Sequence, residues 1–395
     1  MFDAVIVGGG PAGCFTGKLL AKRGFEVAII EEHAEIGNPV CCAGIVGVGG
    51  LRELGIKPNS KWALNKLRNA LIYPPAGEPI VLTRKKVEAL SIDRALFDKE
   101  LAYTAADAGT TFMMKTRCIN ITIGEKASVK IRKVDGWDEL ETRLVIGADG
   151  PVSLVARKAG LLKKASYTRC VQVEVEAEID DDCVEVYLGN SFAPGFSAWL
   201  VPAGGMCRAG LGASTGAPKL LEFLKTHPAA SKKVHLKKLT HLTAGLIPQP
   251  LTRKIYGDRV MLVGDAAGHV KPLTGGGIYL GLACAKIAAE VAVQALETEN
   301  SPQVLQRYER AVAEQFGVEF EFGSRARRLL ERLSDAELND LLKLLATPEL
   351  LSLVLEKANF NHHGQLLKSL IRRSPSLIRS LGLKKLSRYL RYSMQ

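Results

Sequence analysis

The chain has 395 residues, of which 47% are hydrophobic and 24% are charged, and its net charge is +12. That composition is typical of a folded protein with a large core and excludes a disordered or fibrous chain. We expect no signal peptide, because the first residues lack its basic and apolar regions, and no uncharged run is long enough to cross a membrane. The eight cysteines lack a C-x-x-C spacing, which predicts a reducing, cytoplasmic environment and no metal site.

The N-terminal segment predicts a dinucleotide-binding unit. Residues 5–7 have the pattern of a buried strand. Three glycines follow at the G-x-G-x-x-G spacing: Gly8, Gly10 and Gly13. The first permits a tight turn, the second lets a pyrophosphate approach the backbone, and the third lets helix and strand pack closely. Residues 14–23 predict a helix, residues 27–30 a second strand, and Glu31 lies where a carboxylate binds ribose hydroxyls. The alternative is a glycine-rich turn in another kind of parallel α/β domain.

Two thiols and an arginine follow this unit. A loop rich in glycine and proline, residues 35–46, contains the adjacent Cys41 and Cys42 and is placed to reach over a bound cofactor. The alternative is a pair of small, buried and inert cysteines, which is the commoner fate of free cysteine. A helix predicted over residues 91–108 has Arg94 in its first turns, either as a phosphate or ribose contact or as an ordinary surface arginine.

The middle of the chain predicts two kinds of sheet. Alternating segments between residues 111 and 144 predict strands that lead back to the first sheet, where Asp149-Gly150 forms a second turn between a buried strand and a helix. Residues 168–250 change character, because short alternating strands follow one another with glycine turns between them. This pattern predicts an antiparallel domain with one open face. That face carries Trp199, unless its side chain belongs to the core.

A third glycine-centred turn brings the chain back to the parallel sheet. Residues 260–263 predict a buried strand that ends at Gly264-Asp265. A run of glycines at residues 275–277 then begins a long helix. Consecutive glycines at a helix start expose N–H groups to a ligand oxygen or to a planar ring that lies on the backbone. This turn is therefore a second candidate ligand site on the same sheet.

The C-terminal region predicts helices and one basic amphipathic segment. Ser334 and Glu337 have the spacing of a capping box. After Glu356 there is no acidic residue, and residues 382–391 place leucines on one helical face and lysines and arginines on the other. A basic amphipathic helix binds anionic membrane surfaces. We therefore predict a cytoplasmic protein that lies peripherally on the membrane, with an ordinary surface helix as the alternative, and we expect no nucleic acid partner.

Three glycine-centred turns on one parallel sheet, with an antiparallel domain inserted before the third, resemble the FAD-binding fold shared by aromatic hydroxylases, flavin halogenases and geranylgeranyl reductases. The resemblance covers residues 1–297. It implies an α/β chain with three parts. They are a Rossmann-like FAD-binding domain (1–167, with a return segment 251–300), an inserted antiparallel β-sheet substrate domain (168–250) and a C-terminal helical region (301–395).

The resemblance implies FAD as the cofactor. In that family the first turn and Glu31 hold the ADP half, and Asp265 binds the ribityl chain. The residues implied in FAD binding are Gly8, Gly10, Ala12, Gly13, Glu31, Glu32, Cys42, Ala43, Gly44, Arg94, Asp149, Gly150, Gly264, Asp265, Pro272, Gly275, Gly276, Gly277 and Ile278. The middle motif departs from the family at one place, because its usual arginine is Ala156 here and Arg157 follows one position later.

Three details resemble the geranylgeranyl reductases in particular. The loop of residues 39–44 is similar to the cysteine-glycine loop of that group, with Cys42 at the matching position. Residues 194–202 resemble the pattern P-x-x-Y-x-W-x-F-P. The matching positions are Pro194, Trp199 and Pro202. The two other aromatic residues of the pattern are replaced, by Ser197 and Val201. The third detail is the run from Pro272 to Ile278, which resembles the glycine run that abuts the flavin.

The resemblance implies reduction of isolated C=C bonds in geranylgeranyl or polyprenyl chains. Such a bond has no carbonyl group to polarise it, so a hydride donor and a proton donor must meet in one pocket. Reduced FAD supplies the hydride at N5. Trp199 and Phe196 are predicted to stabilise cationic character on the alkene, by about 1–2 kcal/mol when desolvated. Cys42 is predicted to face the flavin and the substrate.

The partners implied are a geranylgeranyl or polyprenyl lipid as substrate, an anionic membrane surface, and an external electron donor. Because the chain has no second nucleotide-binding motif, this donor is either NAD(P)H bound transiently or a small redox carrier.

Other functions use the same fold. An aromatic hydroxylase would add oxygen to an aromatic acid, and a halogenase would need a W-x-W-x-I-P motif, of which only Trp199 and Pro202 match. A related quinone reductase would need a cysteine cluster near its C-terminus, whereas the last cysteine here is Cys284. A non-catalytic lipid- or RNA-binding protein on a flavin fold is the remaining class, and it would purify without colour and fail to take up FAD.

Overall fold

The computed structural model describes residues 1–162, 166–212, 216–249, 254–298 and 301–372. The strands are β1 (Phe2–Val7), β2 (Val27–Ile30), β3 (Ile45–Gly47), β4 (Ala63–Leu67), β5 (Asn69–Tyr73), β6 (Ile80–Thr83), β7 (Ala89–Ile92), β8 (Thr111–Met113), β9 (Arg117–Ile123), β10 (Ala127–Lys133), β11 (Gly136–Gly147), β12 (Tyr167–Ala177), β13 (Cys183–Tyr187), β14 (Ala198–Ala203), β15 (Met206–Gly212), β16 (Val234–Pro248), β17 (Tyr256–Gly257) and β18 (Val260–Leu262). The helices are α1 (Pro11–Ala21), α2 (Val48–Glu53), α3 (Arg94–Ala106), α4 (Leu154–Lys158), α5 (Gly216–Thr226), α6 (Ile278–Glu297), α7 (Pro302–Leu330), α8 (Asp335–Leu345), α9 (Pro348–Lys357) and α10 (Gly364–Arg372), with 3-10 turns η1 (Ala230–Lys232) and η3 (Gly264–Ala267).

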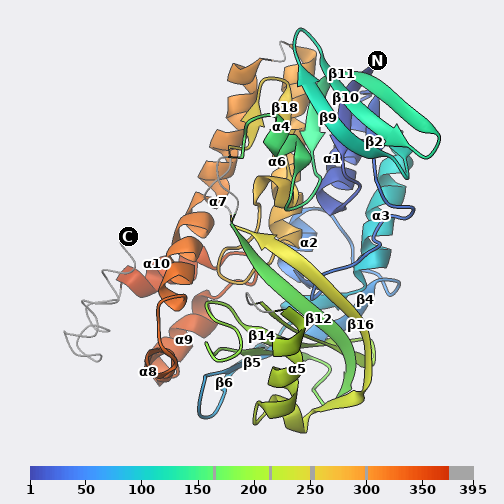
Figure 1. Ribbon diagram of the computed structural model, residues 1–395. Coiled ribbons are helices and arrows are strands. Elements are labelled where there is room, and N and C mark those ends of the chain that lie inside the picture. The colour runs from blue at the N-terminus through green and yellow to red at the C-terminus, as the bar shows by residue number, and fades with distance from the viewer. Residues whose placement is uncertain (163–165, 213–215, 250–253, 299–300, 373–395) are drawn as a thin grey trace.

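The predicted strand–helix–strand unit at the N-terminus is confirmed. Strand β1 lies at the centre of a sheet with the order β17-β18-β11-β1-β2-β8 and runs parallel to both of its neighbours. Every residue of β2 and the last four of β1 are buried. Such continuous apolar strands are typical of parallel sheets covered on both faces. Helices α1, α3 and α6 pack together against this sheet, which occupies the upper part of Figure 1.

Strand β11 joins two sheet regions. Its first half pairs antiparallel with β10, which pairs in turn with β9, and its second half runs parallel to β1 inside the main sheet. The strands predicted between residues 111 and 144 are therefore present. Strand β8 pairs parallel with β2 in the main sheet, and β9, β10 and the first half of β11 form an antiparallel extension of it.

A second sheet forms the lower part of the molecule (Figure 1), with the order β16-β12-β15-β14-β13-β5-β6. The predicted antiparallel strands of residues 168–250 make up most of it. Strands β5 and β6 lie within residues 1–167, which we predicted from the sequence to belong to the FAD-binding domain. They join because β5 pairs in parallel with β13, from Asn69 opposite Cys183 to Tyr73 opposite Tyr187. The two tyrosine rings stack with their centroids 4.5 Å apart.

Helix α7 spans both regions of the molecule. Near its start, the Tyr308 hydroxyl donates a hydrogen bond to the Leu262 carbonyl of β18 at 2.8 Å. Near its end, Arg327 Nη2 donates to Thr168 Oγ1 of β12 at 2.9 Å. The long helix therefore ties the parallel sheet to the second sheet, and Figure 1 shows it along one side of the molecule.

The C-terminal helices follow α7. The capping box predicted at Ser334 and Glu337 is confirmed at the start of α8. The basic amphipathic segment predicted over residues 382–391 lies outside the described residues. Within the described ranges, α6 is the one helix long and apolar enough to cross a membrane, and 72% of its apolar window is buried inside the protein. That burial is typical of a core helix.

We predict that Tyr308→Phe lowers the free energy of unfolding by about 1–2 kcal/mol. The substitution removes a hydroxyl that is fully buried and leaves the Leu262 carbonyl with one partner fewer. Urea denaturation of both proteins measures the change. Tyr103→Phe is the matched control, because Tyr103 is 68% exposed on α3. Equal stabilities for the two variants would contradict the role given to the buried hydrogen bond.

Candidate active site

The three glycine-centred turns meet at the carboxyl edge of the parallel sheet. A methyl group added at Gly13 would lie 2.1 Å from the Gly8 carbonyl oxygen, and one added at Gly8 would lie 2.4 Å from the carbonyl oxygen of Ala148. Gly8 also has φ +106°, a conformation that other residues rarely adopt. In the third turn, Gly264 lies beside Ala12 of α1. Glycine at these positions lets the first, middle and third motifs approach one another.

Gly10 differs from the other two glycines of the first motif. It precedes α1 in extended conformation, with φ −71° and ψ 178°, and an added methyl group there would have no atom of the described chain within 4 Å. No side chain caps the N-terminus of α1. The free N–H groups and the open backbone therefore form a cradle of the kind that binds a pyrophosphate.

Glu31 is fixed relative to this cradle. Its carboxylate accepts hydrogen bonds from the Gly9 amide at 2.8 Å and from the His33 amide at 2.9 Å. Next to it lies an open surface hollow of about 560 Å³, large enough for an adenosine group. The lining residues are Glu32, His33, Lys115, Arg117, Arg132, Lys133 and Val134. Glu31 and Glu32 are thus at the end of β2 where the resemblance places the ribose.

In the middle motif, the Asp149 carboxylate forms hydrogen bonds with other groups of the protein. Asp149 accepts hydrogen bonds from the Ser153 hydroxyl at 2.6 Å and from the amides of Leu154 and Val155 at 2.7 and 3.1 Å. Burial raises the pKa of Asp149, and these hydrogen bonds oppose the shift. The side chain therefore caps α4, and the Asp149 backbone lies against Gly8 of the first motif.

The third motif and the glycine run are neighbours. A methyl group added at Gly277, the residue before α6, would lie 3.3 Å from Asp265 Oδ1. Gly275 has φ +71° and lies against Phe196, whose Cζ would be 3.2 Å from an added methyl group. The run from Pro272 to Ile278 therefore meets both the predicted ribityl-binding aspartate and one of the two predicted aromatic residues.

The two adjacent cysteines point to different elements. Cys42 Sγ accepts a hydrogen bond from the Gly44 amide at 3.3 Å and lies near the Arg94 guanidinium. The hydrogen bond uses the sulfur as acceptor, so it does not use a thiol proton. Cys41 Sγ instead lies against Gly245 of β16, near Thr243. The structure thus distinguishes the two thiols, as the sequence alone does not.

Arg94 is held in place by its own helix. Its Nε and Nη2 atoms bond to the two carboxylate oxygens of Asp98 at 3.0 and 2.8 Å. Burial lowers the pKa of Arg94, but the attraction of the Asp98 carboxylate is stronger, so the net shift is upward and the side chain stays charged. A partly buried cation that Asp98 fixes beside Cys42 differs from the surface arginine that was the alternative. Whether it also contacts FAD stays a prediction.

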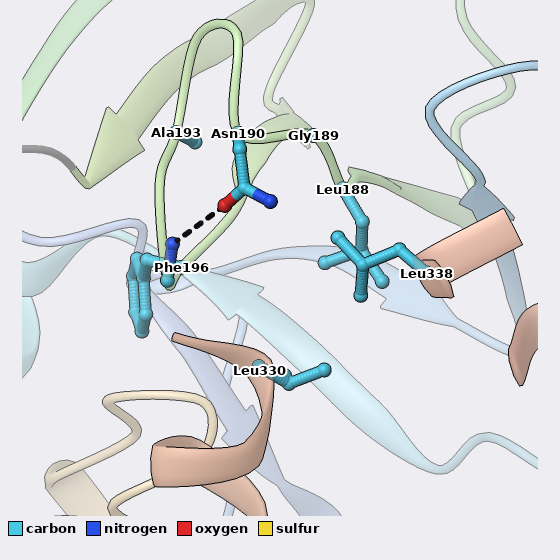
Figure 2. A pocket seen from close by; sticks show the side chains of 8 residues that line it. Leu188, Gly189, Asn190, Ala193, Phe196, Leu330 and Leu338 are labelled. Atoms are coloured by element: carbon cyan, nitrogen blue, oxygen red, sulfur yellow. Dashed lines mark hydrogen bonds between the residues drawn. The ribbon is translucent and has the colours of Figure 1, made fainter. Parts of the chain in front are cut away.

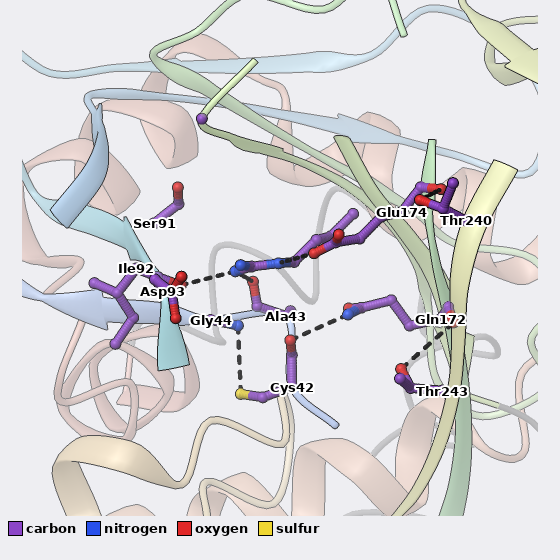
Figure 3. A network of polar contacts seen from close by, with 12 residues as sticks. Cys42, Ala43, Gly44, Ser91, Ile92, Asp93, Gln172, Glu174, Thr240 and Thr243 are labelled. Carbon is purple, nitrogen blue, oxygen red and sulfur yellow. Dashed lines mark hydrogen bonds and ion pairs between the residues drawn. The ribbon is translucent and has the colours of Figure 1, made fainter. Parts of the chain in front are cut away.

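A polar network connects the cysteine loop to the second sheet (Figure 3). Gln172 Nε2 donates to the Cys42 carbonyl oxygen at 3.1 Å. Trp199 Nε1 in turn donates to Gln172 Oε1 at 3.1 Å. Arg208 Nη1 donates to the carbonyl oxygens of Ala43 and Ile92 at 3.3 and 2.8 Å. Trp199 lies outside the buried core of its sheet. The loop and the indole are therefore held in one fixed arrangement.

Sequence reasoning missed Gln172 and Arg208. Both are buried, with 6% and 7% of their surface exposed. One signal was available, because a polar side chain at an inward position of an alternating strand needs a partner. Arg208 donates a hydrogen bond to the Ala43 carbonyl oxygen, 165 positions away in the sequence, and no local pattern indicates that partner.

Phe196 is buried between the glycine run and α7. The guanidinium of Arg327 lies 4.6 Å from the centroid of its ring, and Phe196 meets the Trp199 ring edge to face at 6.5 Å. Beyond Phe196 lies a small crevice, shown in Figure 2, whose walls are mostly apolar. Its lining residues are Leu188, Gly189, Asn190, Ala193, Gly195, Phe196, Leu330 and Leu338. Phe196 therefore contacts both the glycine run and this crevice.

Comparisons with known proteins agree with this geometry. The family model of the FAD binding domain matches residues 1–317. Digeranylgeranylglycerophospholipid reductase 2 of Methanopyrus kandleri is 34% identical over 96% of this chain and 98% of its own. Digeranylgeranylglycerophospholipid reductase 1 of Methanothermobacter thermautotrophicus is 36% identical over 96% and 97%. The chain belongs to this reductase family.

Solved structures extend the comparison. A geranylgeranyl bacteriochlorophyll reductase-like protein of Thermoplasma acidophilum has a TM-score of 0.85 at 30% identity and covers 96% of this chain and 98% of its own. A p-nitrophenol 4-monooxygenase of Pseudomonas putida has a TM-score of 0.73 at 19% identity, covering 90% and 97%. At that identity the likeness to a monooxygenase shows the fold alone. The predicted fold class and the predicted cofactor, FAD, are both confirmed.

The residues present fit FAD along its length. The open backbone at Gly10 suits the pyrophosphate, Glu31 and the neighbouring hollow suit the adenosine, and Asp265 with the glycine run suits the ribityl chain and the ring. The contacts of individual residues with FAD, and the catalytic roles of Cys42, Trp199 and Phe196, stay predictions.

We predict that Gly10→Ala weakens FAD binding without changing the stability of the FAD-free protein. The methyl group would meet no atom of the described chain, but it would enter the cradle for the pyrophosphate. Gly13→Ala should instead destabilise the FAD-free protein, because its methyl group would lie 2.1 Å from the Gly8 carbonyl oxygen. Thermal unfolding and FAD titration by fluorescence quenching measure the two effects separately.

Gly317→Ala is the control for this pair. It lies within α7 with no atom within 4 Å of an added methyl group, so it should stabilise the helix by up to about 1 kcal/mol and leave FAD affinity unchanged. If Gly10→Ala bound FAD as tightly as the unaltered protein, the pyrophosphate would not lie at Gly10.

Proposed function

We propose that this chain is an FAD-dependent oxidoreductase that reduces isolated C=C bonds in the geranylgeranyl chains of a glycerophospholipid. The observation that carries the proposal is the convergence of three parts. The Cys42 loop and the Trp199 indole are joined through Gln172, and Phe196 joins the same wall to the glycine run at Gly275. The family to which the chain belongs includes relatives named for this lipid.

Different residues are suited to different steps of such a reduction. FAD in its reduced form supplies a hydride to one carbon of the alkene. The Cys42 thiol, whose sulfur accepts a hydrogen bond from the Gly44 amide, is our candidate for the proton donor to the other carbon. Trp199 presents an indole ring whose orientation is fixed by Gln172, suited to stabilise cationic character on the substrate. Phe196 is less suited to that role, because Arg327 already places a positive charge against its ring.

Phe196 also lines a narrow and mostly apolar crevice together with Leu188, Leu330 and Leu338 (Figure 2). The crevice is too narrow in this structure to hold a hydrocarbon chain, so the lipid substrate rests on the family to which the chain belongs. The substrate is a geranylgeranyl lipid and the reaction also requires a reductant. For the reductant, we propose either NAD(P)H bound transiently or a small redox carrier.

The test of the function uses a geranylgeranyl ether phospholipid and dithionite as reductant. We expect mass spectrometry to show the addition of two hydrogen atoms for each reduced bond, only when protein with bound FAD is present. An aromatic hydroxylase would instead consume oxygen with an aromatic acid, and a binding protein would leave the lipid mass unchanged. An unchanged lipid mass with FAD-replete protein would refute the proposal.

Within this assay, Cys42→Ser should lower turnover by roughly 100-fold, the contribution expected of a general acid. FAD should remain bound, because the serine oxygen can still accept from the Gly44 amide. Cys41→Ser is the matched control, since Cys41 contacts Thr243 and Gly245 and should have little effect. Equal losses in the two variants would indicate two packing thiols.

We also propose that the protein is cytoplasmic and docks peripherally on an anionic membrane through its C-terminal segment. Support comes from the absence of acidic residues after Glu356 and from the four basic residues on one predicted helical face: Lys384, Lys385, Arg388 and Arg391. Basic residues near an anionic bilayer contribute about 1 kcal/mol each, and salt screens them.

The prediction is that the full chain sediments with anionic vesicles at low salt and less at high salt. A chain that ends at Gly382 should largely lose this binding, because it lacks the basic face. Vesicles of neutral lipid are the control. If the shortened chain sedimented as well as the full one, the membrane proposal would lose its support.

A further inference from the structure

Lys271 is a buried cation that the proposed reaction does not use. It lies between η3 and the glycine run, and only 4% of its surface is exposed. Its Nζ donates a hydrogen bond to the Phe360 carbonyl oxygen at 2.5 Å and lies 4.6 Å from the centroid of the Phe360 ring. Burial lowers the pKa of Lys271 to about 8, against a smaller upward effect of Glu319. The side chain is therefore mostly charged at neutral pH.

The lysine is part of the same turn as the glycine run. Its amide donates to the Gly276 carbonyl oxygen at 3.1 Å, and its carbonyl oxygen accepts from the Gly275 amide at 2.8 Å. A methyl group added at Gly276 would lie 2.9 Å from Lys271 Cε and 3.5 Å from Nζ. The ammonium group thus lies directly against the backbone of the run that the FAD ring is expected to meet.

The Lys271 ammonium forms no ion pair among the described residues. In the part of the chain that the structure describes, its ammonium contacts a neutral carbonyl oxygen and an aromatic ring. The ionisable groups that face this region are Glu319 on α7 and the histidines before α10, His362 and His363. Burial raises the pKa of Glu319, whose carboxylate accepts the Gly364 amide at 2.7 Å rather than the lysine. A buried charge without a contact counter-ion acts over a longer range than an exposed one.

We propose that Lys271 raises the reduction potential of the bound FAD. The inference rests on the FAD-dependent function proposed above. Reduction of the flavin ring takes up two electrons and one proton at N5, which leaves one additional negative charge on the ring. A fixed positive charge behind the glycine run stabilises that reduced form relative to the oxidised one. Lys271 acts through its charge, without contact with the substrate.

The experiment measures the midpoint potential of the FAD-replete full chain at pH 7, by dithionite titration against a reference dye with no lipid present. We expect Lys271→Met to lower the potential and Lys271→Arg, which keeps the charge, to remain close to the unaltered protein. Lys130→Met is the matched control. It removes an equal charge from a lysine that also lies over an aromatic ring, Trp137, but on the exposed β10–β11 hairpin. Its potential should not change.

An unchanged potential in Lys271→Met with FAD bound would overturn the proposal, as would an equal fall in Lys271→Arg. If Lys271→Met does not retain FAD, Lys271→Gln answers the same question, because it keeps a donor for the Phe360 carbonyl. Loss of FAD in both neutral variants would assign Lys271 a structural role instead. Because the potential is measured without lipid, a protein that shows the shift but reduces no lipid refutes the proposed function and leaves this inference standing.

Discussion

The close approach of backbone at the carboxyl edge of the parallel sheet determines the arrangement of the whole FAD-binding half. Gly13 of α1 touches the Gly8 carbonyl, and Gly8 touches the Ala148 carbonyl, at distances that leave room only for hydrogen atoms. Helix α1 therefore begins at the sheet edge with its N–H groups exposed, and the β11 turn closes against it. Glu31 and Gly264 are then placed by their contacts with Gly9 and Ala12. A side chain at Gly8 would push the first and middle motifs apart.

The substrate half is held by a different kind of interaction. The cysteine loop has few apolar side chains to bury, and Arg208 and Gln172 hold it by bonding to its backbone carbonyls. Burying a guanidinium and an amide is favourable only when their hydrogen bonds are satisfied. The loop therefore depends on the second sheet for its shape. This dependence explains why the Cys42 thiol, from the FAD-binding part, and the Trp199 indole, from the second sheet, are held in fixed positions relative to each other.

The sequence predicted best what local patterns encode. Continuous apolar strands, glycine spacing and the Ser334 capping box are short-range signals, and the corresponding elements are present. The pairing of β5 with β13 and the bond from Arg208 to Ala43 join residues more than a hundred positions apart, and neither leaves a trace in the neighbouring sequence. The carboxylate of Asp149 illustrates a second limit. Its motif indicates a cofactor turn, whereas the side chain itself caps a helix.

Helix α7 has a mechanical consequence. Its 29 residues make a rod of about 43 Å. The rod is anchored to β18 by Tyr308 and to β12 by Arg327. A rod fixed at both ends opposes hinge rotation between the two sheets. A long hydrocarbon would have to enter lengthwise, without separation of the sheets. Access for each successive double bond would then depend on sliding of the chain, with the protein frame held still.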